Sequence, residues 1–498
     1  MKSAWNDADA AAAVARYAAQ GVGEDLALRT YSARLLGRDP SLVLHGGGNT
    51  SVKTTATDLF GEEVEVLCVK GSGWDLGAIE PAGHPAVRLA PLRRLRALER
   101  LSDEDMVGVQ RQNLMDAAAP NPSVETLLHA FLPAKFIDHT HSTAVLALAD
   151  QPDAEALIRK VYGGRAACVP YVMPGFALAR LAAEVHAANP DVEGLILLKH
   201  GIFSFGATAQ ESYERMIALV SLAEDYVASR PPAAKGRAME TAPAEAVLPI
   251  LRGAVGRAGG GRWIADLRTG EAALGVANDA RLADWARRGV ATPDHVIRTK
   301  RSPLVLPAPS GDLGVWREAA EAEIETFVGA YEAYFARNVR RFPEGRKALD
   351  PVPRVAAIPG LGLVGFGKTA AEAAVTADIA ESWARTLLMA EAVGCFEPVG
   401  DADTFDLEYW SLEQAKLGKA AERRLERHVA LVTGGGGAIG AAVAKAFAAE
   451  GAEVAVLDLD LGAAERAARA AGKQALAIAC DVTDAGSVKA AFAAVVRR

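Results

Sequence analysis

Hydrophobic and polar positions change their spacing several times along the chain, and each spacing predicts a different element. Helical spacing at Asp7–Gln20 and Gly23–Gly37 gives way to short apolar runs that alternate with glycine loops. The longest apolar run, Ala134–Leu148, predicts a buried strand, and Gly194–His200 predicts another. Mixed helices and strands of this kind predict an α/β fold.

Two histidines interrupt the run Ala134–Leu148 and point to a possible metal site. Side chains two residues apart on a strand lie on the same face, so the imidazoles of His139 and His141 can converge on one ion. His200, at the end of its own apolar run, is a candidate third nitrogen ligand. For an isolated His-x-His pair, two hydrogen-bonded histidines at a sheet edge are an equally good interpretation.

Two glycine loops follow predicted strands and offer donors to an anion. The loop Gly46–Gly48 comes after Leu42–Leu44, and Lys70–Gly73 comes after Val64–Val69. Glycine lets the backbone N–H groups approach an anion closely, and Asn49 adds a side-chain donor. The spacing of a nucleotide-binding Walker loop is absent, so a small phosphorylated molecule fits better than a nucleotide. An ordinary loop is the alternative.

The segment Pro122–His129 predicts a helix that starts just before the histidine strand. Ser123 is a plausible N-cap, and Glu125 in the first turn complements the helix dipole. Glu125 could equally be a metal ligand and proton carrier, whereas His129 suggests packing or support of the ligand residues.

Composition narrows the class of protein. A net charge of −8 argues against a nucleic-acid partner, and no apolar run reaches the roughly 18 residues of a membrane span. The N-terminus lacks the apolar segment of a signal peptide. Four scattered cysteines without a Cys-x-x-Cys pair argue against a disulfide framework and predict a cytoplasmic protein.

Taken in chain order, the motifs of the first half resemble the class II aldolase/adducin family, which includes fuculose- and rhamnulose-phosphate aldolases. The ordered set is Gly47-Gly48-Asn49-Thr50-Ser51, Gly71-Ser72-Gly73, Ser123-Val124-Glu125, His139-Thr140-His141, Pro174-Gly175 and Lys199-His200-Gly201. The resemblance covers most of residues 25–230. It implies an α/β/α sandwich around a mostly antiparallel sheet and a homo-oligomer.

The resemblance also implies roles for individual residues. Zinc, or another divalent metal, would be bound by His139, His141 and His200. Glu125 would be the general acid/base. The substrate phosphate would be bound by Gly48, Asn49, Ser72 and Gly73. The implied reaction is cleavage of a ketose 1-phosphate, with the metal as Lewis acid. Epimerases of pentulose phosphates share the metal ligands, and a non-enzymatic adducin-like protein is a further alternative, although it would be expected to lack them.

The chain then repeats part of this unit. Gly201–Glu211 reappears as Gly362–Glu372, with six of the eleven positions identical. Ile137–His141 has an apparent counterpart in Val296–Lys300. This predicts a diverged aldolase-like copy, although a generic strand–helix junction would also explain the match.

In that copy, the metal ligands are replaced. Arg298 and Lys300 stand in place of His139 and His141, and Leu361 stands in place of His200. We therefore expect the copy to lack a metal. It would either pack against the first unit or bind an anion through Arg298 and Lys300.

The C-terminal pattern is strand, glycine turn, helix. The strand His428–Thr433 runs into the glycines Gly434–Gly440, and Asp458 ends the next strand. This resembles the nucleotide-binding half of a short-chain dehydrogenase (an incomplete Rossmann segment), which implies an NAD site at Gly434, Gly440, Asp458 and Asp481. The family's Tyr-x-x-x-Lys motif is absent, so we expect no dehydrogenase activity and NAD only as a vestigial or weak ligand.

The order of units resembles bifunctional rhamnulose-1-phosphate aldolase/short-chain dehydrogenase proteins with the second part cut short. The predicted division is residues 1–235 as the catalytic domain, 236–425 as the diverged extension, and 426–498 as the truncated Rossmann segment. An intact two-step aldolase–dehydrogenase is the alternative that the missing motif argues against.

Overall fold

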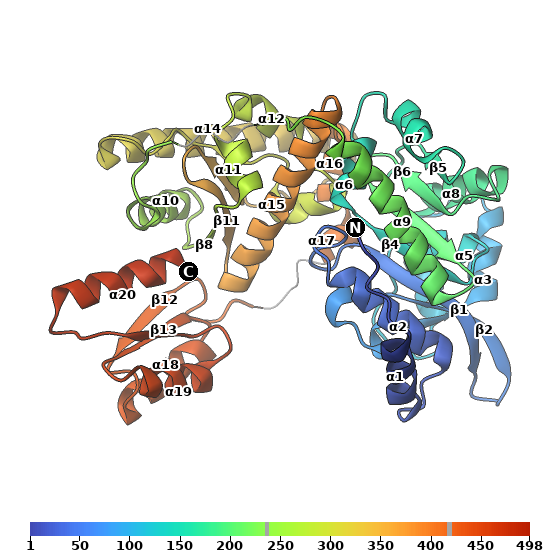
Figure 1. Cartoon of the computed structure of the whole chain (residues 1–498), viewed down its shortest axis with the longest axis horizontal. Coiled ribbons are helices and arrows are strands. Elements are labelled where there is room, and N and C mark those ends of the chain that lie inside the picture. Colours follow the sequence, from blue (N-terminus) through green and yellow to red (C-terminus); the bar gives the residue numbers. More distant parts are fainter. Residues whose placement is uncertain (235–238, 416–420) are drawn as a thin grey trace. The chain divides into compact units, whose positions relative to one another are not determined.

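The computed structural model describes residues 1–234, 239–415 and 421–498 (Figure 1). These residues form two compact units. Unit 1 comprises Met1–Ala233, Val290–Asp294 and Thr386–Lys416, and unit 2 comprises Ala234–Gly289, His295–Arg385 and Leu417–Arg498. The predicted boundary at 235/236 lies outside the described residues, and the three-domain division stays a prediction.

A seven-stranded sheet forms the centre of unit 1. Its strands are β1 (Asn49–Thr57), β2 (Glu63–Val69), β3 (Ala86–Arg88), β4 (Phe136–Thr140), β5 (Ala166–Val169), β6 (Gly194–Leu197) and β7 (Gly201–Gly206). They are ordered β3-β2-β1-β4-β7-β6-β5. Neighbouring strands are antiparallel except β5 and β6, which are parallel. The predicted mostly antiparallel sheet is confirmed.

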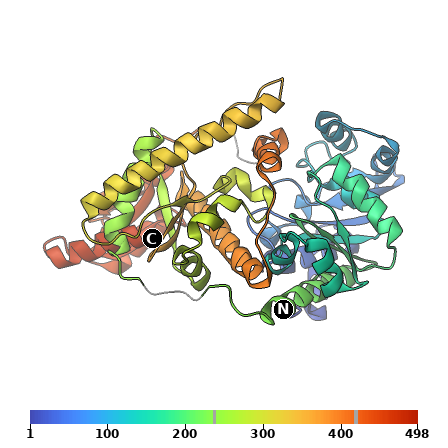
Figure 2. The same ribbon diagram turned by 90° about the horizontal axis from the view of Figure 1, so that it is seen from above.

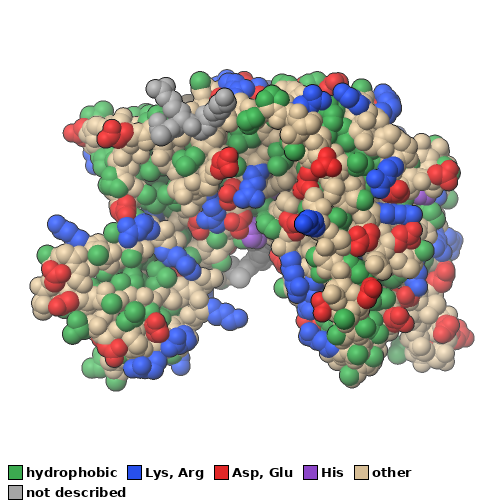
Figure 3. All heavy atoms as spheres, viewed as in Figure 1, with side chains coloured by type: hydrophobic (Ala, Val, Ile, Leu, Met, Phe, Trp, Pro, Cys, Tyr) green, Lys and Arg blue, Asp and Glu red, His purple; other side chains and the backbone are tan. Residues whose placement is uncertain are grey.

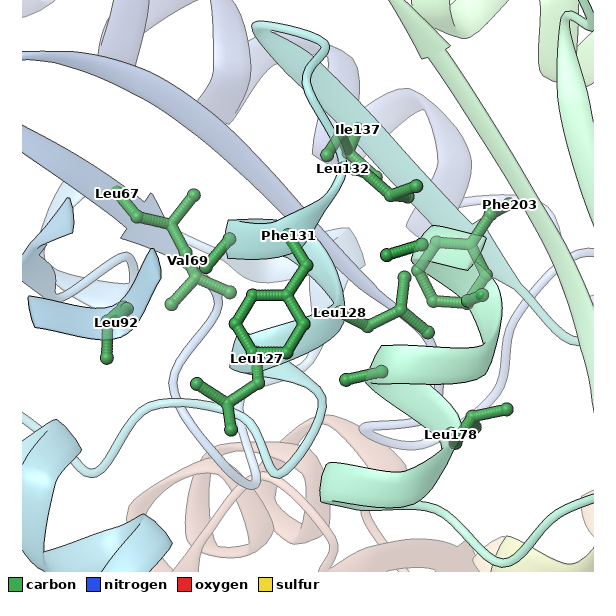
Figure 4. Packing of buried hydrophobic residues seen from close by; sticks show 14 of the residues in the cluster. Leu67, Val69, Leu92, Leu127, Leu128, Phe131, Leu132, Ile137, Leu178 and Phe203 are labelled. Atoms are coloured by element: carbon green, nitrogen blue, oxygen red, sulfur yellow. The ribbon is translucent and has the colours of Figure 1, made fainter. Parts of the chain in front are cut away.

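Helices cover both faces of this sheet. One face packs against α3 (Leu89–Arg94), α5 (Thr126–Phe131) and α8 (Phe176–Ala188), and Figure 4 shows the core that they bury with Leu67, Ile137 and Phe203. The other face packs against α2 (Glu24–Gly37), α6 (Thr143–Ala149), α7 (Ala154–Tyr162) and α9 (Ala209–Ala228). Unit 1 also contains α1 (Asp7–Ala18), α4 (Asp103–Gln112), α16 (Asp401–Glu408) and α17 (Ser411–Gln414). The unit is the expected α/β/α sandwich.

One predicted strand of unit 1 is shorter than expected, and another is absent from the described residues. The run Ala134–Leu148 divides into strand β4 and helix α6. Every residue of α6 is buried, and a continuous apolar run cannot by itself distinguish a buried strand from a buried helix. Leu42–Leu44 is not a strand, so the first glycine loop precedes β1 and does not follow a strand.

A fully buried ion pair ties strand β4 to helix α2. Arg29 Nη2 lies 2.5 Å from Asp138 Oδ1, and neither side chain is exposed. Asp138 Oδ2 accepts a hydrogen bond from Ser212 Oγ on α9 at 2.6 Å. The guanidinium also donates to the carbonyls of Ser51 and Ile137. Elements α2, β1, β4 and α9 therefore meet at one charge pair, directly beside His139.

A four-stranded sheet in unit 2 repeats part of this topology. Strands β8 (Ile264–Arg268), β9 (Leu304–Val305), β10 (Val355–Ile358) and β11 (Gly362–Gly367) are ordered β8-β11-β10-β9. Strand β11 is antiparallel to β8 and β10, and β10 is parallel to β9. Strands β4-β7-β6-β5 have the same order and directions, so the copy repeats four of the seven strands of the first sheet.

Helices of unit 2 surround this small sheet. They are α10 (Ala244–Ala258), α11 (Glu271–Ala277), α12 (Leu282–Arg288), α13 (Val296–Thr299), α14 (Leu313–Asn338) and α15 (Ala370–Val393), the last of which extends into the part assigned to unit 1. Figure 2 shows α14, in yellow, as one continuous rod.

The register identifies which strand corresponds to β4, and it is not the predicted one. Val296–Thr299 is the short helix α13, with Val296, Ile297 and Thr299 buried, a spacing that suits a helix turn. The counterpart of β4 is β8: Leu267 pairs with Val364 of β11 as His139 pairs with Phe203 of β7. The alignment of Arg298 and Lys300 with His139 and His141 is therefore wrong, because a five-residue match with one identical position was too short to fix it.

The C-terminal segment is a parallel three-stranded sheet. Strands β12 (Val429–Thr433), β13 (Glu453–Asp458) and β14 (Leu476–Ala479) alternate with α18 (Ala438–Ala449), α19 (Leu461–Ala471) and α20 (Ala485–Arg497). The predicted strand–turn–helix order of a Rossmann segment is confirmed.

The next features concern the charges on the surface and the apolar character of the helices. Acidic and basic side chains are interspersed on the face shown in Figure 3. Among the described residues, no helix combines the length and apolar character that crossing a bilayer requires.

Substitution of one partner of the buried ion pair should destabilise the protein strongly. Asp138→Asn leaves Arg29 charged and buried, so we expect a loss of about 3–5 kcal/mol in the free energy of unfolding, measured by urea titration. Glu65→Gln, which breaks the exposed pair with Arg93, is the control and should cost less than about 1 kcal/mol. Equal effects of the two substitutions would contradict the structural role of the pair.

Candidate metal centre

Three histidines from neighbouring strands converge in unit 1. His139 lies in β4, His141 follows that strand directly, and His200 lies in the turn between β6 and β7. The Nε2 atoms of His139 and His141 are 3.0 Å apart. One nitrogen from each residue lies within 4.8 Å of the others, and all three side chains are buried. Antiparallel pairing of β4 with β7 brings the predicted set together.

His139 is held in the form that binds a metal. Its Nδ1 is 3.0 Å from the carbonyl oxygen of Ile202, which can only accept, so Nδ1 carries the proton and Nε2 has a free lone pair. Burial lowers the pKa of His139, and nearby Glu125 only partly offsets this effect. The ring stacks on Phe203 with centroids 4.1 Å apart. The hydrogen bond to Ile202 and the stacking on Phe203 therefore hold the imidazole of His139 in one orientation, and burial favours its neutral form.

The donor set fits a divalent ion. Neither nitrogen of His200 has a hydrogen-bond partner among the described residues, although both are buried. Nitrogens bound tetrahedrally to zinc at 2.0–2.1 Å would lie about 3.3 Å apart, close to the observed spacing of His139 and His141. A side chain at Gly201 would lie 2.5 Å from the Thr140 carbonyl and 3.0 Å from both imidazoles, so only glycine fits there.

Glu125 lies beside the histidines at the start of α5. Its Oε2 is 3.4 Å from His139 Nε2, and its Oε1 is 3.4 Å from His200 Nε2. The helix begins at Thr126, slightly later than predicted, and the turn before it is closed by hydrogen bonds to the Ser123 carbonyl. The carboxylate therefore faces two of the three candidate ligands.

A buried hydrogen-bond chain fixes the orientation of Glu125. Asn49 Nδ2 donates to Glu125 Oε2 at 2.6 Å, and Asn49 Oδ1 accepts from His129 Nε2. His129 Nδ1 in turn accepts from Ser51 Oγ at 2.7 Å. Burial lowers the pKa of His129 well below its usual value, so the ring is neutral and the directions of all three bonds follow. Of the two interpretations of His129, packing and support of the ligand residues, these hydrogen bonds favour support.

The glycine loops and Glu125 line one cavity. Its lining residues are Gly46, Gly48, Asn49, Lys70, Ser72, Gly73, Ser123, Val124, Glu125, Pro174 and Asp294. All four predicted phosphate-binding residues are among them. Lys70 Nζ donates to the carbonyls of Gly46 and Gly48 at 2.6 and 3.0 Å, which fixes the first loop and adds a positive charge.

Three lining residues with polar side chains, Lys70, Ser123 and Asp294, were not among the predicted site residues. Lys70 begins the second glycine loop, and a lysine next to a donor-rich loop was a usable signal. Ser123 was interpreted only as an N-cap. Asp294 lies far along the chain, in no recognisable motif, so no sequence signal could have found it.

The remaining candidates lie in unit 2. Arg298 and Lys300 line a cavity together with Arg354 and Lys368, and Lys300 Nζ lies 4.0 Å from the centre of the Tyr331 ring.

Glycines and an aspartate meet at the first turn of the Rossmann segment. A side chain on Gly440 would lie 2.3 Å from the Gly434 carbonyl, and Asp458 Oδ2 accepts from the Gly436 amide at 2.9 Å. Asp481, after β14, accepts from Thr483. Gly434, Gly440 and Asp458 are thus brought together, as an NAD site requires.

Three family models match successive parts of the chain. The class II aldolase and adducin N-terminal domain matches residues 29–227, the second domain of class II aldolase matches 242–417, and short chain dehydrogenase matches 428–498.

Individual known proteins are also similar to this chain. The chain is 35% identical over 480 residues to the uncharacterized oxidoreductase YuxG of Bacillus subtilis (strain 168), covering 93% of this chain and 69% of that protein. Galactitol 2-dehydrogenase of Agrobacterium fabrum is 46% identical over 72 residues, which are 14% of this chain and 28% of that protein. A solved N-terminal class II aldolase domain from Thermoplasma acidophilum is 39% identical, with 41% of this chain and 93% of that chain covered and a TM-score of 0.39.

Unit 1 thus defines an aldolase-type α/β protein with a histidine cluster that can hold a metal. The chain belongs to the class II aldolase/adducin family and carries a short-chain dehydrogenase segment at its C-terminal end.

Zinc binding should depend on the three histidines. We expect roughly one zinc ion per purified chain, measured by elemental analysis, and a loss of most of it in His200→Ala. His186→Ala, on α8 outside the cluster, should retain the ion. Equal zinc in both variants would contradict the assignment.

Proposed function

We propose that the chain is a metal-dependent aldolase that cleaves a ketose 1-phosphate, such as rhamnulose 1-phosphate, to dihydroxyacetone phosphate and lactaldehyde. The observation that carries the proposal is the position of Glu125. The carboxylate faces the histidine cluster and also lines the cavity that the two glycine loops line.

Phosphate binding is assigned to the glycine-loop end of that cavity. Backbone N–H groups at Gly48 and Gly73 and the hydroxyl of Ser72 are suitable donors, and the charge of Lys70 favours an anion. Asn49 has two roles in this proposal: it lines the phosphate end of the cavity, and its amide nitrogen donates to Glu125. Holding the phosphate here would place the adjacent carbons of the sugar near the histidines.

Metal binding is assigned to His139, His141 and His200. When bound, a divalent ion would supply Lewis-acid stabilisation of the negative charge that develops at the ketone oxygen. No lysine Schiff base is needed for this class of reaction.

Proton transfer is assigned to Glu125. Cleavage of the carbon–carbon bond leaves the bonding pair on the carbon next to the ketone, while the hydroxyl of the departing aldehyde loses its proton. Ionised Glu125 would accept that proton and then deliver one to the carbon, so the carboxylate ends as it began. Asn49 and His129 would hold it in place.

The C-terminal segment is proposed only as a weak NAD-binding unit. The short chain dehydrogenase model matches 71 residues, 428–498, and we assign them cofactor binding only. A homo-oligomer of a cytoplasmic protein remains our expectation from the family.

Cleavage of rhamnulose 1-phosphate tests the proposal directly. We expect turnover by the zinc-loaded protein, at least a hundredfold less with Glu125→Gln, and a similar loss with His141→Ala through loss of metal. Dihydroxyacetone phosphate would be measured by a coupled assay, with the surface variant Glu155→Gln as control. Unchanged turnover in both site variants would overturn the proposal.

His129 should act on turnover through Glu125. In His129→Phe, Asn49 loses the bond that fixes its amide, so we expect kcat to fall roughly tenfold or more, with zinc content and KM nearly unchanged. His129→Gln, which can still donate to Asn49, should recover part of kcat. A fall in zinc content that matches the fall in kcat would indicate a structural role instead.

A further inference from the structure

A short segment remote in sequence belongs to the metal centre. Val290–Asp294 is part of unit 1, although the residues on either side of it are not. Val290, Ala291 and Thr292 are buried, and Thr292 Oγ1 donates to the His200 carbonyl at 3.3 Å. The segment is therefore anchored beside the third candidate ligand.

The last residue of this segment carries a carboxylate into the cavity. Asp294 Oδ2 is 3.7 Å from His141 Nε2, its side chain is 20% exposed, and it lines the same cavity as Ser72 and Glu125. It does not belong to the group of atoms within 4.8 Å of one another that the three histidines form. The carboxylate thus lies beside the centre, where it can contact a bound molecule.

We propose that Asp294 binds a hydroxyl group of the aldehyde half of the substrate and restricts that half to neutral hydroxyaldehydes. The inference rests on the proposed aldolase function. A carboxylate can only accept hydrogen bonds, and a hydroxyl is the donor that a sugar offers. The glycine loops and Lys70 supply the donors for phosphate, which leaves the Asp294 side for the uncharged end.

The charges of the cavity disfavour an aldehyde half that carries its own negative charge. Glu125 and Asp294 place two carboxylates along the cavity, so an aldehyde with a carboxylate or second phosphate would meet groups of its own charge there. Asp294 therefore acts by attraction of hydroxyl groups and by repulsion of anions.

Condensation with dihydroxyacetone phosphate measures this preference, because aldehydes of matched size can be compared. Lactaldehyde and propanal differ by one hydroxyl. We expect wild type to favour lactaldehyde in kcat/KM by roughly tenfold or more, since the hydrogen bond is to a charged acceptor. Asp294→Ala should reduce that ratio to below about threefold. Asp294→Asn should raise the rate with glyceraldehyde 3-phosphate relative to lactaldehyde.

The outcomes separate this inference from the function on which it rests. Absence of condensation with every aldehyde by zinc-loaded wild type would overturn the proposed function. Activity of wild type with an unchanged lactaldehyde/propanal ratio in Asp294→Ala would overturn the role of Asp294 alone. Loss of zinc from Asp294→Ala would also overturn it, because Asp294 would then be holding the metal. Asp191→Asn, an exposed acid of unit 1, is the matched control and should keep the wild-type ratio.

Discussion

The buried ion pair between Arg29 and Asp138 is the constraint on which the candidate site depends. Successive residues of a strand face opposite sides of the sheet, so Asp138 faces α2 and α9 while His139 faces the cluster. A buried charge pair is costly unless its geometry is good and its remaining donors and acceptors are satisfied. Ser212 donates a hydrogen bond to Asp138, and Arg29 donates one to the Ile137 carbonyl. These two bonds satisfy part of the pair's hydrogen-bonding capacity, and they fix the backbone that carries His139.

The opposite face of the same strand shows how the site is prepared for chemistry. Hydrogen bonds fix His139 through Ile202 and fix Glu125 through Asn49, His129 and Ser51. Each of these groups is buried, where an unpaired polar group would be unfavourable. Among the described residues, both nitrogens of His200 and Glu125 Oε1 are buried without a hydrogen-bond partner, which fits atoms that face a metal or a bound substrate.

The repeated sheet of unit 2 shows that this fold does not by itself create the site. Strands β8, β10 and β11 have the connections of β4, β6 and β7, but Leu267 has the register of His139 and Leu361 occupies the turn position of His200. An apolar core replaces the imidazoles, with Leu361 buried among hydrophobic neighbours. The chemistry thus depends on a few side chains that one copy has and the other lacks.

Much of this could be predicted from sequence, and the failures have physical causes. The histidines, Glu125 and the glycine loops are recognisable because metal and anion chemistry restrict residue type and order. Strand β4 was predicted too long because α6 is apolar on every side. Val296–Thr299 was misassigned because a five-residue match with one identical position cannot distinguish a strand from a helix turn. The chain His129–Asn49–Glu125 and the approach of Asp294 arise only in three dimensions.

The central claim is that one divalent ion occupies the three-histidine cluster. Anomalous diffraction from crystals of the zinc-loaded protein, collected on both sides of the zinc absorption edge, tests it most directly. We predict one strong peak per chain within bonding distance, about 2.0–2.1 Å, of nitrogens from His139, His141 and His200. A map with no peak there, or with its peak at other residues, would contradict the account.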